Sequence, residues 1–163
     1  MKKWITMGLT MLLLTGCGAA ETFETVTDVL VQPAAALRRD IVFSPPADAA
    51  IPSMVSDEGD RLYLCGKFVL TTQTRDAGDL AGTVRAVSGY DPDGLTILET
   101  DQDGLKRYDF TWVSAGEGGN QVGRAAVLDD GSYHYILSVM APEADSGELS
   151  QTWDVLLRSF SAV

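Results

Sequence analysis

The sequence predicts an α+β domain built on an antiparallel sheet, with one short helix and one long helix. Several runs rich in β-branched, aromatic and aliphatic residues are separated by turn-forming residues, as is typical of antiparallel strands. Helical periodicity is found at two places, residues 80–88 and residues 146–160. Because the strands are segregated from the helices and do not alternate with them, the pattern indicates the α+β class.

The first half of the chain after residue 22 is expected to be mostly extended. Its strand segments are rich in β-branched and apolar residues, and the prolines fall in the segments between them. The last of these strands is predicted as one uninterrupted element because it contains no proline. The predicted strands are residues 23–31, 38–44 and 61–74, and the predicted breaks are residues 32–36 and the loop of residues 45–59.

A short helix is predicted between two well-defined end signals. Asp79 is a good N-cap, because its carboxylate can accept a hydrogen bond from a free N–H of the first turn. Gly89 suits the position after the helix, where the left-handed conformation is common. Leu80, Val84 and Val87 fall on one face at helical spacing and are expected to be the buried side of this helix.

Four more strands are predicted between the two helices, joined by links rich in Asp and Gly. In the second of them, Tyr108, Phe110 and Trp112 alternate with polar residues and therefore share one face. The Asp-Gly pair at 130–131 predicts a tight hairpin, because glycine tolerates the positive φ that such turns need. The predicted strands are residues 95–100, 106–115, 121–128 and 132–140, and the links are Asp101–Gly104, Gly116–Asn120 and Asp129–Gly131.

The long helix is predicted for residues 146–160. Glu148 lies near its positive start and Arg158 near its negative end, as the helix dipole favours. Its apolar stripe needs an apolar sheet face to cover, and we expect the aromatic face of residues 106–115 to be that partner. The stripe consists of Leu149, Trp153, Leu156, Leu157 and Phe160.

The C-terminal part of the chain resembles the Mog1/PsbP-like fold. The resemblance is carried by the strand Arg124–Leu128, the turn Asp130-Gly131, the strand Tyr133–Leu137 and the helix that ends in Ser159-Phe160. It implies a curved antiparallel sheet with helices packed on it. Known members are binding or assembly-accessory proteins, and the resembling motifs contain no functional residue that could be carried over to this chain.

The first twenty residues have the pattern of a secretion signal. Lys2 and Lys3 precede the apolar run Trp4–Leu14, which is shorter than the about 20 residues needed to span a bilayer. The run continues into Leu14-Thr15-Gly16-Cys17, which resembles the lipobox of bacterial lipoproteins. The resemblance implies that Cys17 is acylated on its sulfur and becomes the first mature residue. The expected segments are a signal of residues 1–16, a lipidated cysteine with a short tether of residues 17–22, and a single domain of residues 23–163.

The mature chain is strongly acidic, so we expect a lipid and not surface charge to hold it at the membrane. Without Lys2 and Lys3 it has 10 basic residues against 23 acidic ones, a net charge of −13. Nucleic acid and anionic headgroups repel such a chain on average, and no nucleic-acid partner is expected. With Cys17 acylated no intrachain disulfide is expected, and Cys65, which lies in an apolar run, is predicted to be a core residue.

The patterns that could bind an ion or a phosphate are weak. The turns Asp91–Gly94 and Asp101–Gly104 resemble fragments of calcium loops. An EF-hand loop counted from Glu99, however, would place Phe110 where a glutamate ligand is required, so weak calcium binding is the lesser alternative to two plain turns. The glycine-rich Gly116–Asn120 leads into a strand and not into a helix, and is interpreted as a hairpin loop. The sequence predicts no cofactor, no metal site and no catalytic residue.

The leading functional hypothesis is a non-enzymatic binding or accessory module, anchored on the extracytoplasmic face of the cell membrane. Its expected partner is a membrane-proximal or cell-envelope protein, and the hypothesis predicts an exposed apolar patch. One alternative is a membrane-tethered hydrolase, which would need His134 and an acid in a concave pocket. His134 is the only histidine of the sequence, and it is expected to have a structural role. Another alternative is a small-ligand carrier with an apolar pocket between helix and sheet.

Overall fold

The computed structural model describes residues 36–116 and 118–163. The predicted signal, the lipidated Cys17, the tether and the predicted strand of residues 23–31 lie outside the described residues. In chain order the elements are β1 (Ile41–Val42), a 3₁₀ turn (Ala47–Ala49), β2 (Met54–Val55), β3 (Arg61–Cys65), β4 (Phe68–Asp76), α1 (Leu80–Ser88), a second 3₁₀ turn (Pro92–Gly94), β5 (Ile97–Gln102), β6 (Leu105–Gly116), β7 (Gly119–Asp129), β8 (Tyr133–Pro142), α2 (Glu143–Ser159) and β9 (Ser161–Ala162).

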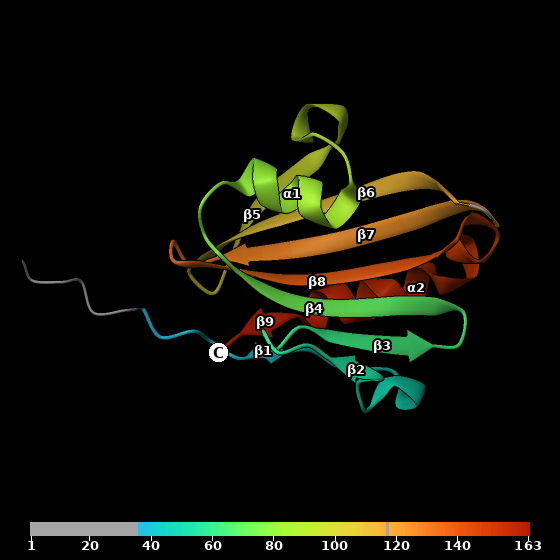
Figure 1. Cartoon of the computed structure of the whole chain (residues 1–163), viewed down its shortest axis with the longest axis horizontal. Helices are drawn as coiled ribbons and strands as arrows, with labels where there is room; N and C mark the ends of the chain where they lie inside the picture. Colours follow the sequence, from blue (N-terminus) through green and yellow to red (C-terminus); the bar gives the residue numbers. More distant parts are fainter. Residues whose placement is uncertain (1–35, 117) are drawn as a thin grey trace, which may run out of the picture. The chain divides into compact units, whose positions relative to one another are not determined.

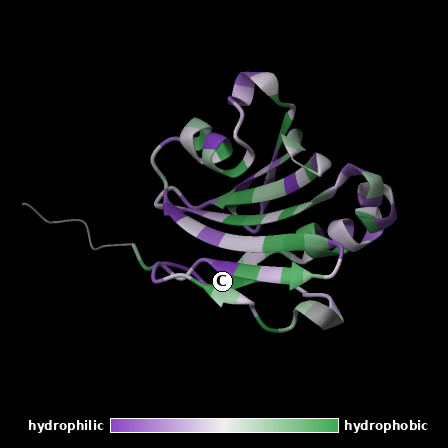
Figure 2. Ribbon diagram, turned by 45° about the vertical axis from the view of Figure 1, so that its right-hand side comes forward, coloured by the Kyte–Doolittle hydropathy of each residue, from purple (hydrophilic) through white to green (hydrophobic). Residues whose placement is uncertain are grey.

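Seven of these strands form one antiparallel sheet in the order β2-β3-β4-β8-β7-β6-β5 (Figure 1). Its longest strands are β6, β7 and β8, which follow one another in the chain as two hairpins, and β8 is the central strand of the sheet. The strands bend along their length (Figure 2). The short strands β1 and β9 pair with each other and join the two ends of the domain. The predicted antiparallel α+β architecture is thus confirmed.

The two helices cover opposite faces of the sheet, and each has its own core. Trp153 of α2 lies in a large cluster with Leu70, Leu128 and other residues of the strands. Val84 of α1 lies in a smaller cluster, which contains the aromatic side chains of β6. The expectation that the long helix covers that aromatic face is therefore wrong. Strand alternation determines which residues share a face, but it does not determine which helix packs on that face.

The N-terminal half differs from the prediction in two places. Residues 61–74 form two strands, β3 and β4, and not one. Gly66, with φ of 60°, and Lys67 form a two-residue hairpin link, and Cys65 pairs with Phe68. The predicted loop of residues 45–59 contains the edge strand β2, in which Met54 pairs with Leu62. The short strand expected within residues 38–44 is present as β1.

The predicted end signals of α1 are confirmed. The Asp79 carboxylate accepts a hydrogen bond of 3.0 Å from the Ala81 N–H, and Gly89 adopts the left-handed conformation with φ of 81°. The hairpin at Asp129–Gly131 is also present. Helix α2 begins at Glu143 and not at residue 146, directly after Pro142 ends β8, and its whole predicted apolar stripe is buried.

Candidate functional site

Helix α1 leaves part of its sheet face uncovered, and this part carries a row of apolar residues. Leu64 of β3 pairs with Val69 of β4, which pairs with Met140 of β8. Met140 pairs with Gly123 of β7, and Gly123 pairs with Trp112 of β6. Residues paired across strands point to the same face of a sheet. These five residues therefore lie side by side on the face that α1 partly covers, and we call them the apolar row.

Gly123 allows the indole of Trp112 to lie across the neighbouring strand. A Cβ atom at position 123 would stand 2.7 Å from Cη2 of Trp112 and closer still to two other ring carbons. Real Cβ contacts are longer than 3.0 Å, so the ring occupies the space that any side chain at this position would need. The indole of Trp112 thereby occupies the space left by the missing side chain of Gly123 and forms an aromatic surface over β7.

The apolar row is partly open to solvent. The exposed fraction is 59% for Leu64 and 39% for Met140, whereas Val69 is half-buried and Trp112 is buried. A cleft of about 200 Å³ separates the row from α1. Its other lining residues are the apolar Ala86 and Val87 of the helix and the polar Thr71, Gln73 and Ser138 of the sheet. An apolar platform with a few polar groups beside it is suited to hold an apolar segment of another molecule.

The edge strand β2 extends this surface. Met54 pairs with Leu62, which lies two residues before Leu64 in β3 and therefore on the same face. Met54 is exposed and Leu62 is half-buried. The exposed apolar surface consequently continues from the middle of the sheet to its β2 edge.

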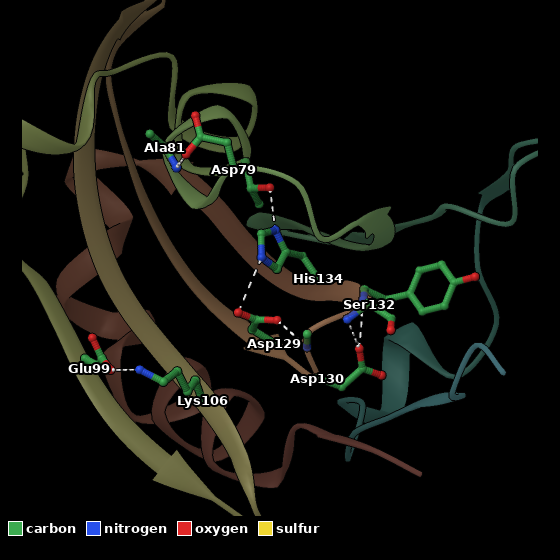
Figure 3. Close-up of polar contacts among 11 residues, drawn as sticks. Asp79, Ala81, Glu99, Lys106, Asp129, Asp130, Ser132 and His134 are labelled. Carbon is green, nitrogen blue, oxygen red and sulfur yellow. Dashed lines mark hydrogen bonds and ion pairs between the residues drawn. The ribbon is translucent and has the colours of Figure 1, made fainter. Parts of the chain in front are cut away.

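His134 does not lie on this surface. It is only 2% exposed, and its Nδ1 is 2.7 Å from the hydroxyl oxygen of Thr83 in α1 (Figure 3). Its Nε2 is 3.7 Å from the carboxylate of Asp129, its cross-strand neighbour, and that carboxylate also accepts a hydrogen bond from the Gly131 N–H. The imidazole thus connects α1 with the β7–β8 hairpin, as expected for a structural strand histidine.

The other residues singled out from the sequence lie in structural positions. Cys65 is buried in the cluster under α2, with its Sγ 3.8 Å from the carbonyl oxygen of Tyr63, and the prediction of a core cysteine is confirmed. Residues 91–94 form a 3₁₀ turn, and residues 103–104 link β5 and β6. Cys17, the predicted lipidation site, lies outside the described residues.

Sequence reasoning missed the apolar row because the row depends on long-range strand register. One local signal was present, since a glycine inside a strand often marks the close approach of another group. Gly123 interrupts an otherwise regular strand pattern and could have indicated that a large side chain crosses β7 at this point.

Comparison with known proteins defines the fold of the chain as Mog1/PsbP-like. Neither a model of a known protein family nor a curated protein sequence matches the chain. Several solved structures are nevertheless similar to it, at sequence identities that show the fold alone.

Three of these structures represent the fold in different organisms. The cyanobacterial PsbP (CyanoP) of Synechocystis is 14% identical with a TM-score of 0.56, over 92% of this chain and 99% of that one. LpqN of Mycobacterium tuberculosis, described as involved in cell envelope biogenesis, is 12% identical with a TM-score of 0.51, over 76% and 83%. The Ran-binding protein Mog1p of Saccharomyces cerevisiae is 14% identical with a TM-score of 0.51, over 76% and 90%.

Proposed function

We propose that this chain is a lipid-anchored, extracytoplasmic binding module that holds an apolar segment of a membrane-proximal protein on its apolar row. The apolar row is the observation that carries the proposal. It exposes aliphatic side chains and a methionine on a sheet face, next to a cleft, on a chain that is otherwise strongly acidic. Apolar surfaces of this kind on a charged protein are typical of interaction sites. The accessory roles of proteins with this fold are in keeping with such a function.

The proposed anchor rests on the lipobox-like segment that ends at Cys17. Within residues 36–116 and 118–163 no helix is long and apolar enough to cross a membrane. We expect the wild-type protein in the membrane fraction of cells and the Cys17→Ser variant in the soluble fraction, because several acyl chains on one residue give stable anchoring. Cys65→Ser is the matched control and should remain with the membrane. Membrane retention of Cys17→Ser would contradict the anchor.

The geometry favours binding over the enzymatic alternative. A general base must reach a proton of the substrate within hydrogen-bond distance. His134 is instead buried, and one of its ring nitrogens is engaged by Thr83. Its nearest carboxylate, that of Asp129, is 3.7 Å away and lies on the same hairpin. The arrangement supports a packing role for this histidine and offers no route for a substrate to reach it.

The carrier alternative needs space between the long helix and the sheet. That space is filled by Trp153, Leu156 and Phe160, which are at most 1% exposed. Phe68 packs edge-on against Trp153, with ring centroids 6.3 Å apart, and closes the β4 side of the same interface. Ligands of drug size usually occupy cavities of about 300–1,000 Å³ lined mainly by apolar groups. Two clefts of about 500 and 410 Å³ reach α2 at Leu157 and Leu156, but charged residues such as Asp109 and Glu148 are among their lining, and the interior of the interface is packed with side chains.

Site-specific photocrosslinking in intact cells tests the binding proposal. A photoreactive amino acid at Leu64 should crosslink to one dominant membrane-proximal protein. The same amino acid at Val155, on the outer side of α2, is the matched control, because Val155 is also apolar and 55% exposed. Met140→Asp in the Leu64-labelled protein should abolish the crosslink by placing a charge in the row. Equal crosslinking from both positions, or crosslinking that Met140→Asp does not change, would contradict the proposal.

A further inference from the structure

We infer that a second, polar cleft, at the end of the sheet where the described chain begins, is a binding site for an oxyanion of the phosphate type. The cleft has a volume of about 160 Å³ and lies between residues 38–41 and the strands β3 and β4. Three of its lining residues are arginines, Arg38, Arg39 and Arg61. Such a concentration of guanidinium groups is unusual in a chain with only 12 basic residues against 23 acidic ones.

The inner wall of the cleft contains a hydroxyl group without a protein partner. Thr72 lines the cleft and is 3% exposed, yet its side chain makes no hydrogen bond to another residue of the described ranges. Buried polar groups in folded proteins are nearly always hydrogen-bonded, to protein, water or ligand. The Thr72 hydroxyl is not among the fully buried polar atoms that lack a partner, so a water or a ligand oxygen in the cleft can reach it and complete its hydrogen bonding.

The three arginines retain most of their donors for a ligand. Nη1 of Arg38 donates to the backbone carbonyl of Glu58 at 3.1 Å. Nη1 of Arg39 donates to the carbonyl of Ala162 at 3.5 Å. Arg61 forms no ion pair or side-chain hydrogen bond with the rest of the described chain. Each guanidinium carries five N–H donors in a planar fork, a geometry that matches phosphate oxygens in a bidentate manner.

Acidic residues also line the cleft or lie beside it, and they offset part of its positive charge. The carboxylate of Glu58 is paired with Arg75 at 3.2 Å, and Arg75 is also paired with Asp60 at 3.0 Å. Asp130, which lies 3.7 Å from Arg39, accepts backbone hydrogen bonds within its own hairpin. Asp40 has no cationic partner among the residues that the structure describes. The lining of the cleft therefore holds three arginines against two carboxylates, those of Asp40 and Glu58, and the guanidinium groups are its cationic donors for an anion.

The size of the cleft restricts the ligand to a small group. At about 30 Å³ per water molecule, 160 Å³ corresponds to about five waters. That space suits a tetrahedral oxyanion with part of its hydration shell and is too small for most drug-sized ligands. Two sources provide this chemistry, a free phosphate and the phosphodiester of a lipid headgroup.

The possibility that a lipid headgroup supplies the phosphate group depends on the proposed anchor at Cys17. The inferred oxyanion site does not depend on that anchor. Arg38 and Arg39 are among the first described residues after Cys17 in the sequence. If Cys17 is lipidated, these two arginines lie 21 and 22 positions after the anchored cysteine. A headgroup contact at this point would orient the domain, although the net negative charge of the chain opposes general binding to anionic membranes.

The test uses the whole mature chain carrying Cys17→Ser, so that acylation contributes nothing to the result. Titration with inorganic phosphate at constant ionic strength, followed by NMR, should shift the amide signals of Arg61 and Thr72 in a saturable way. Arg61→Gln should weaken this binding about tenfold, in line with the loss of a charge-assisted hydrogen bond. Thr72→Val should weaken it several-fold, and Asp40→Asn should tighten it.

The matched control and a vesicle assay complete the test. Lys106→Gln removes the same charge from an exposed lysine on β6, paired there with Glu99, and should leave phosphate binding unchanged. Sedimentation with phosphatidylcholine vesicles, with and without phosphatidylglycerol, separates the two sources. Binding to the phosphatidylglycerol vesicles that Arg61→Gln abolishes supports a lipid headgroup, and phosphate binding without vesicle binding supports a soluble oxyanion. No saturable shift, or equal losses in Arg61→Gln and Lys106→Gln, would overturn the inference.

Discussion

Replacing Gly123 with alanine tests the packing of the apolar row most directly. The backbone of residue 123 has an ordinary strand conformation, since its φ is not among the positive values. Alanine is therefore compatible with the main chain, and by itself should stabilise the strand by about 0.5–1 kcal/mol over glycine. The nearest obstacle is the indole of Trp112, whose Cη2 would lie 2.7 Å from the new methyl carbon.

The expected net effect is a loss of stability of about 1–2 kcal/mol. Forcing an extra carbon into a packed region usually costs about 1–3 kcal/mol, and the propensity gain offsets part of this. Gly147→Ala in α2 is the matched control, because no atom lies within 4 Å of a Cβ at that position. In a helix interior the same change should stabilise the domain by about 1 kcal/mol. The two substitutions are therefore expected to have opposite signs.

Urea unfolding of the Cys17→Ser chain, followed by circular dichroism and tryptophan fluorescence, measures both effects. Because Trp112 must move away from β7, its emission should change in Gly123→Ala and not in Gly147→Ala. Adding Trp112→Leu to Gly123→Ala should cost less than the sum of the two single changes, since the conflict is then absent. If Gly123→Ala proves as stable as the parent with unchanged fluorescence, the indole does not lie over β7.

Two further predictions concern polar side chains. Thr83→Val should lower the free energy of unfolding by about 1–3 kcal/mol in urea titrations, because it leaves the buried Nδ1 of His134 without its 2.7 Å partner. For Asp130, burial alone would raise the pKa, but hydrogen bonds from the Tyr133 and Ser132 N–H groups and the Tyr135 hydroxyl, with the nearby Arg39, lower it below its ordinary value of 3.8. A carboxyl group whose pKa is lowered on folding stabilises the folded state at pH values above its unfolded-state pKa. This stabilisation is lost as the pH falls through the folded-state pKa. The stability difference between wild type and Asp130→Asn should therefore shrink as the pH falls below about 4, and a constant difference would refute the assignment.

The elements that could be predicted from the sequence are those with local determinants. Helix α1 is fixed by a side-chain cap at Asp79 and a left-handed glycine at Gly89, both encoded within a few residues. The hairpin at Asp129–Gly131 is equally local. Gly66-Lys67 carried a similar signal, because glycine at the first position of a two-residue link suits a hairpin turn. This signal is obscured because the apolar character of the chain continues on both sides of Gly66-Lys67.

The assignment of helices to sheet faces could not be predicted, because it depends on contacts between distant parts of the chain. Alternation in β6 places Phe110 on one face and Arg107 on the other, but both helices have an apolar side that fits either face. The structure shows that Arg107 points to α2, where its guanidinium donates to the carbonyl of Leu157 at 2.8 Å. A pattern of apolar residues does not show that a buried arginine packs against the end of the long helix, so the pattern cannot decide which helix covers the aromatic face.

The division of the sheet into two different faces explains how the domain can expose an apolar row and remain stable. On the α2 face several polar side chains are paired: Arg107 binds both carboxylate oxygens of Asp109 at 2.6 and 2.7 Å, and Gln102 donates to the carbonyl of Phe160 at 2.7 Å, whereas the indole Nε1 of Trp153 has no hydrogen-bond partner among the described residues. The largest buried side chains, among them Trp153 and Tyr135, also lie there. Because that face holds most of the core, substitutions of exposed residues in the row, such as Leu64 and Met140, should change stability little. The residues of the row can therefore change largely independently of the fold, which agrees with a Mog1/PsbP-like fold that is kept at sequence identities of 12–14%.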